Sequence, residues 1–141
     1  MRHFQNALRA WCGIVAAACL IGMSPLDADA QPNDINVTLL GTGSPRPDFD
    51  RFSMSTLVQA GGMNLMFDVG RGSAIRLWQI GVLLGSIDAV FLTHYHSDHT
   101  SGLPDLWFTG GIDVQYGRRR QALSVFGPRG VVAAVSLPQR A

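Results

Sequence analysis

The chain has 141 residues, a formal net charge of +1 and a hydrophobic fraction of 47%. That length is enough for one domain at most, and the composition is that of an ordinary globular protein. A net charge so close to zero makes no case for a nucleic-acid or membrane partner. The sequence contains neither Lys nor Glu, so any carboxylate chemistry must come from Asp.

The first thirty residues have the pattern of a secretory signal peptide. A weakly basic start precedes an apolar run from Trp11 to Met23, and Ala28-Asp29-Ala30 offers small residues for cleavage. The run is too short to span a bilayer, which needs about 20 residues. We therefore expect a signal peptide at residues 1–30 and a mature chain at residues 31–141, periplasmic or secreted, without a stable membrane partner. A lipid anchor on Cys19 and an uncleaved membrane anchor are the alternatives.

The mature chain is expected to begin with three short strands. β-prone runs cover residues 36–40, 56–59 and 64–68, and Gly61-Gly62 suits a tight hairpin between the last two. The cluster from Gly41 to Pro45 predicts a turn after the first run.

A helix is expected next, because apolar residues between Ser73 and Val82 recur at helical spacing. Ser73 is the candidate N-cap of this helix, and Gly81 is its candidate stop.

The remaining pattern predicts two strands around a helix. Residues 88–93 form a nearly continuous apolar run, which is typical of a strand buried on both faces. A helix over residues 98–107, interrupted by Pro104, and a strand over residues 123–126 follow. The whole order predicts a layered α/β fold with a mostly β core.

Four potential metal ligands, His94, His96, Asp98 and His99, follow the buried strand within six residues. Alternation along an extended chain puts His94 and His96 on one side, where both imidazoles can reach one ion, and the next turn brings Asp98 and His99 toward a second ion. Nitrogen and oxygen donors suit Zn²⁺, with Mn²⁺ or Fe as alternatives. Two ions about 3.5–4 Å apart can stabilise both the attacking and the leaving oxygen of a hydrolysis. The competing interpretation, surface loop histidines, is the weaker one for four ligands at this spacing.

The ligand count is short of a complete catalytic site, which needs three protein ligands and a water at a zinc ion. His3 is the only other histidine, and both cysteines, Cys12 and Cys19, lie with it in the predicted signal peptide. The mature chain therefore has no thiol ligand and no third imidazole for either ion.

The run Thr93-His94-Tyr95-His96-Ser97-Asp98-His99 has the form H-x-H-x-D-H and resembles the metallo-β-lactamase superfamily. Other segments resemble its ribonuclease Z group and the related arylsulfatases: Leu40 to Pro45, Phe67 to Ser73 with the form D-x-G-x-G-[ST], Thr100 to Leu106, and Val125 to Gly130. The resemblance covers roughly Val37 to Gly130. It implies an αββα sandwich of which the first half is present.

The resemblance also implies roles for individual residues. His94 and His96 would bind the first ion, and Asp98 and His99 the second. Asp98 would also act in proton transfer. Asp68 would orient a ligand histidine through a hydrogen bond, although a plain turn carboxylate before a glycine is the alternative.

Complete members of the superfamily have a second, similar half that brings further ligands, and none of these has a counterpart here. We therefore expect a truncated gene product or a fragment, and a homo-oligomer that completes the site is the alternative. The unpaired sheet would then expose an apolar face and edge, which predicts poor solubility. Weak or absent hydrolase activity of this chain alone is expected for the same reason.

Three functions stay open on this basis. The first is hydrolysis of a phosphodiester in the manner of ribonuclease Z, and the second is hydrolysis of a sulfate ester or another small anionic ester by an exported protein. The third is a non-catalytic fragment. Arg118-Arg119-Arg120 could contact a phosphate or sulfate of the substrate, but a solvated loop cluster is the stronger interpretation.

Overall fold

The computed structural model describes residues 34–132. The predicted signal peptide lies outside these residues, so its presence and its cleavage stay predictions. Within the described residues, no helix has the length and apolar character that crossing a membrane requires.

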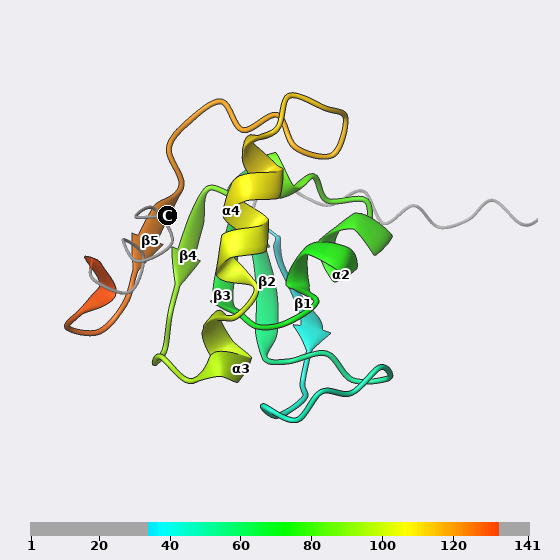
Figure 1. Ribbon diagram of the computed structural model, residues 1–141. Helices are drawn as coiled ribbons and strands as arrows, with labels where there is room; N and C mark the ends of the chain where they lie inside the picture. Colours follow the sequence, from blue (N-terminus) through cyan, green and yellow to red (C-terminus); the bar gives the residue numbers. More distant parts are fainter. Residues whose placement is uncertain (1–33, 133–141) are drawn as a thin grey trace, which may run out of the picture. The chain divides into compact units, whose positions relative to one another are not determined.

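Five strands form one sheet whose spatial order is the order of the chain (Figure 1). They are β1 (Ile35–Gly41), β2 (Ser55–Ala60), β3 (Met63–Val69), β4 (Ala89–Phe91) and β5 (Ser124–Phe126). The pairs β1–β2 and β2–β3 are antiparallel, whereas β3–β4 and β4–β5 are parallel. All five predicted strands are confirmed, with ends that differ by one or two residues. Because β1, β3, β4 and β5 run in the same direction, their carboxyl ends meet at one edge of the sheet.

The helical segments lie in the two crossovers between parallel strands. Helix α2 (Ser73–Gln79) and the 3₁₀ turn η1 (Leu84–Ser86) lie between β3 and β4, and helices α3 (Ser97–Thr100) and α4 (Leu103–Gly111) lie between β4 and β5. The predicted N-cap was placed one residue too late. Gly72, with φ of 88°, caps α2, and the Ser73 hydroxyl donates to the carbonyl of Gly70 at 2.6 Å. The predicted helix at residues 98–107 is two helices, and Pro104 lies in the first turn of the second, where a missing N–H costs no hydrogen bond.

The core lies between one face of the sheet and the helices. Leu57, Met66 and Val90 are fully buried on that face, together with Leu77 of α2 and Leu106 of α4. Figure 1 shows α4 crossing this face, and its apolar residues Leu103 and Leu106 are buried in the core.

The opposite face of the sheet exposes large apolar side chains. Ile35, Val37 and Leu39 alternate along β1 and are 61–69% exposed. Phe67, Phe91 and Phe126 occupy one register position on β3, β4 and β5, and neighbouring rings stack with centroids 5.0 Å apart. The prediction that β4 is buried on both faces was therefore wrong for this face, where Phe91 is only half-buried.

Arg119 forms hydrogen bonds that connect the helical layer to the segment before β4. Its half-buried guanidinium donates to the carbonyls of Leu84, Ile87 and Leu106 at 2.9–3.3 Å. Burial lowers the pKa of this guanidinium, although a shift from so high a value leaves it charged. The interpretation of Arg118-Arg119-Arg120 as a solvated cluster is thus wrong for its middle member.

Two glycines let the segment after β4 approach the end of β3. A Cβ on Gly102 would lie 2.2 Å from the carbonyl oxygen of Gly70, and one on Gly70 would lie 2.2 Å from the carbonyl oxygen of Asp98. The Gly102 N–H donates to the carbonyl of Val69 at 2.9 Å. Both contacts are with backbone atoms, which cannot rotate away as a side chain would.

We predict that Gly102→Ala lowers the free energy of unfolding by about 1–3 kcal/mol, the usual cost of overpacking. Urea denaturation followed by circular dichroism measures this. Gly111→Ala is the matched control, because a Cβ on Gly111 meets no atom within 4 Å and should cause no loss. Equal stability of the two variants would contradict the close approach.

Candidate metal centre

A buried carboxylate, Asp68, stands at the end of β3 and receives donors from two other segments. It lies at a bulge, since Thr56 pairs with Phe67 and Ser55 with Val69, which leaves Asp68 unpaired. Its φ of 59° is in the left-handed region, which Asp tolerates better than most residues. A bulge of this kind turns a side chain away from the regular alternation of the strand.

The Asp68 carboxylate accepts three hydrogen bonds. The backbone N–H of Thr93 donates at 2.8 Å, and the Thr93 hydroxyl lies within 3.0 Å of both carboxylate oxygens. Nδ1 of His99 lies 2.7 Å from Oδ2. The carboxylate therefore connects the segment after β4 to helix α3, and the predicted hydrogen bond between Asp68 and a candidate ligand histidine is confirmed.

The same contact assigns the tautomer of His99. Since a carboxylate accepts, Nδ1 carries a proton, and in the neutral imidazole Nε2 is then the nitrogen with the free lone pair. Nε2 lies 3.5 Å from Oδ2 of Asp98. Asp98 is 8% exposed, and its buried Oδ1 has no hydrogen-bond partner among the described residues. A lone pair beside a buried carboxylate with one unsatisfied oxygen suits a cation, so the donor chemistry fits a metal ion.

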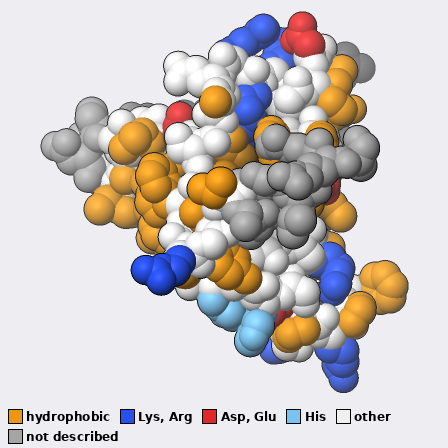
Figure 2. Space-filling view, turned by 60° about the vertical axis from the view of Figure 1, so that its left-hand side comes forward, with side chains coloured by type: hydrophobic (Ala, Val, Ile, Leu, Met, Phe, Trp, Pro, Cys, Tyr) orange, Lys and Arg blue, Asp and Glu red, His pale blue; other side chains and the backbone are white. Residues whose placement is uncertain are grey.

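The other two histidines join this pair. The ring centroid of His94 lies 4.6 Å from that of His96 and 3.9 Å from that of His99. Nδ1 of His94 lies 3.1 Å from the Thr93 hydroxyl, which Asp68 also holds. Figure 2 shows the described histidines side by side at the surface.

The structure thus gathers all four predicted ligands, His94, His96, Asp98 and His99, in one cluster. Among the described residues, however, no group of three His, Cys, Asp or Glu side chains has the geometry that holds a metal ion. His94 and His99 instead make ring-to-ring contact, with planes at 51°. That these four residues bind metal, and that Asp98 moves protons, stay predictions.

Tyr95 adds a contact that sequence reasoning missed. Its hydroxyl donates to the carbonyl of Pro128 at 2.6 Å, and a Cβ on Gly127 would lie 3.4 Å from the same hydroxyl oxygen. The glycine turn after β5 is therefore held against the histidine segment. Thr93 was missed as well, although its place directly before the first histidine could have marked it as part of the site.

Comparison with known proteins places the chain in a family. Residues 35–126 match the family model described as anti-Pycsar protein Apyc1. The ribonuclease Z of Mycobacterium marinum is 45% identical over 101 residues, which are 72% of this chain and 36% of the relative. The ribonuclease Z of Mycobacterium bovis is 40% identical over 107 residues, 76% of this chain and 38% of the relative.

Solved structures of the metallo-β-lactamase fold superpose on this chain as well. The short form of human tRNase Z superposes with a TM-score of 0.60 and 33% identity, over 70% of this chain and 37% of that one. The metallo-β-lactamase fold protein YhfI of Bacillus subtilis has a TM-score of 0.62 and 26% identity, over 71% of this chain and 40% of that one. The chain spans little more than a third of the length of the ribonuclease Z relatives that it matches.

We predict that Asp68→Asn, which keeps the side-chain shape and the tolerance for a left-handed backbone, destabilises the fold by about 1–3 kcal/mol. It should also release the proton of His99 from Nδ1, because an amide cannot replace the carboxylate as acceptor for all three donors. Nitrogen chemical shifts of the imidazole measure the tautomer. Asp88→Asn removes an exposed carboxylate that accepts from Asn64 and is the control. An unchanged His99 tautomer in Asp68→Asn would refute this assignment.

Proposed function

Because the chain belongs to the family of the anti-Pycsar protein Apyc1 and to the ribonuclease Z-like members of the metallo-β-lactamase superfamily, we propose that the protein is a metal-dependent hydrolase of anionic esters. A phosphodiester is the first candidate substrate, since the curated relatives are named ribonuclease Z. The activity, the substrate and the partners of the whole protein are part of this proposal, because the match spans little more than a third of those relatives.

One observation carries the proposal: the buried Asp98 carboxylate lies 3.5 Å from Nε2 of His99, and one of its oxygens has no hydrogen-bond partner among the described residues. A carboxylate oxygen without a hydrogen-bond donor and an imidazole nitrogen beside it are both atoms that can coordinate Zn²⁺. His94, His96, Asp98 and His99 would hold that cation, with Zn²⁺ as the first choice and two ions in a complete site. A bound zinc ion supplies Lewis acidity at an ester.

The residues of the chain would then divide the remaining work. Asp68 keeps the proton of His99 on Nδ1, so that Nε2 faces the site with its lone pair. Thr93 fixes the position of Asp68 through its N–H and its hydroxyl. Asp98 is the candidate for proton transfer to the leaving group, because its Oδ1 is not engaged by another described donor.

A second candidate is hydrolysis of a small sulfate ester, as in the arylsulfatases related to this group. The predicted signal peptide at residues 1–30 favours it, since an exported protein does not meet precursors of transfer RNA. We accordingly propose a periplasmic or secreted location. A homo-oligomer in which another chain adds ligands is a further part of the proposal.

We predict that the purified chain binds Zn²⁺ and that Asp98→Asn weakens this binding by about tenfold or more. Competition with a chromophoric chelator measures the affinity. Asp105→Asn is the matched control, because Asp105 is a carboxylate seven residues away that accepts a hydrogen bond from Thr109. Cleavage of bis(p-nitrophenyl) phosphate and of p-nitrophenyl sulfate, each measured with added zinc, distinguishes the two substrate classes.

The outcomes separate the parts of the proposal. Equal zinc affinity in the wild type and Asp98→Asn would remove Asp98 from the ligand set. Absence of zinc binding by the wild type would refute the metal centre, and zinc binding without cleavage of either ester would favour a non-catalytic role.

A further inference from the structure

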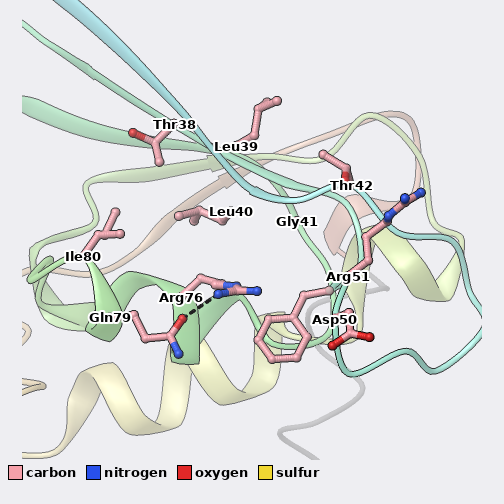
Figure 3. A pocket seen from close by; sticks show the side chains of 11 residues that line it. Thr38, Leu39, Leu40, Gly41, Thr42, Asp50, Arg51, Arg76, Gln79 and Ile80 are labelled. Atoms are coloured by element: carbon pink, nitrogen blue, oxygen red, sulfur yellow. Dashed lines mark hydrogen bonds between the residues drawn. The ribbon is translucent and has the colours of Figure 1, made fainter.

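A groove of about 400 Å³ lies between the carboxyl end of β1, helix α2 and the loop before β2 (Figure 3). Leu40, Phe52 and Ile80 give it an apolar wall, and Thr38 and Thr42 place hydroxyls along it. Volumes of about 300–1,000 Å³ with mostly apolar walls and a few polar groups are usual for sites that bind small molecules. None of the three described histidines lines the groove, so it is separate from the metal centre.

Arg76 is held in position within this groove. Its guanidinium carbon lies 4.7 Å from the centroid of the Phe52 ring, and its Nη1 donates to Oε1 of Gln79 at 2.8 Å. The Phe52 ring packs closely against Gly72, because it fills the space that a Cβ on Gly72 would need. The guanidinium is thus oriented before any ligand arrives, and orienting it costs little further entropy on binding.

The charge of Arg76 has no counterpart in the described part of the chain. No described carboxylate forms an ion pair with it. Asp50 and Arg51 also line the groove, but their opposite charges offset each other and leave a net charge of +1. Figure 3 shows Arg76 between β1 and the helix, whereas Arg51 extends toward Thr42 at the outer end. The donors of Arg76 that Gln79 does not use are therefore available to an anion.

We propose that this groove binds the phosphate group of a small organic phosphate, with Arg76 as the main ligand and the apolar wall against the organic part. A guanidinium matches the geometry of phosphate oxygens. Phosphate suits the groove better than carboxylate, because it offers three terminal oxygens to the donors of Arg76 where a carboxylate offers two. The volume exceeds what inorganic phosphate alone would fill.

Titration of the metal-free protein with 5′-AMP, adenosine and inorganic phosphate, followed by NMR, tests the proposal. Removal of metal with a chelator keeps the phosphate away from the metal centre, so failure here would say nothing about the proposed hydrolase. We expect 5′-AMP to shift the amide signals of residues 38–42 and 76–80. Adenosine and inorganic phosphate should each bind at least tenfold more weakly.

Variants distinguish binding in the groove from nonspecific attraction of the anion to positive charge. Arg76→Gln should weaken 5′-AMP binding at least tenfold, and Arg76→Lys, which keeps the charge but loses the planar fork, should fall between it and the wild type. Arg120→Gln removes an exposed charge elsewhere in the chain and should bind as the wild type does. Undiminished binding by Arg76→Gln, or shifts confined to residues 94–99, would overturn the proposal. Affinity for inorganic phosphate equal to that for 5′-AMP would overturn its organic part.

Discussion

The carboxylate of Asp68 joins parts of the chain that are about thirty residues apart. It leaves β3 at a bulge in a left-handed backbone conformation and receives the N–H and hydroxyl of Thr93 and the ring of His99. A buried carboxylate with fewer donors would carry a large desolvation cost, so the loss of any one of these hydrogen bonds would destabilise the buried Asp68 side chain. The end of β4, the start of α3 and the orientation of His99 all depend on this one group.

Close packing of backbone on backbone complements that carboxylate. Gly70 and Gly102 bring the segment after β4 against the end of β3, and the Gly102 N–H donates to Val69. Because four of the five strands run in one direction, their loops share one edge, and the glycine turn after β5 reaches the same place through Tyr95. The candidate site is therefore assembled from several loops on a common rigid edge, as functional sites often are.

Much of this architecture could be predicted from the sequence, because short apolar runs between glycine turns identify strands well. The H-x-H-x-D-H spacing likewise located the histidine cluster and its place after β4. Contacts between distant side chains could not be predicted, since nothing local marks Arg119 as the residue that binds the carbonyls of Leu84, Ile87 and Leu106. The assumption that β4 is buried on both faces failed for a related reason. A run of apolar residues shows that a strand is hydrophobic, but it does not show which other elements pack against its two faces.

The sheet order β1-β2-β3-β4-β5 repeats the order in which the strands are synthesised. Each new strand therefore pairs with the edge left by the one before it, and none has to be inserted between strands that are already joined. The antiparallel pairs need only shorter loop closures, whereas each parallel pair needs the longer crossover between its strands. The N-terminal strands can thus be assembled on the ribosome while the residues of the histidine cluster are still being translated.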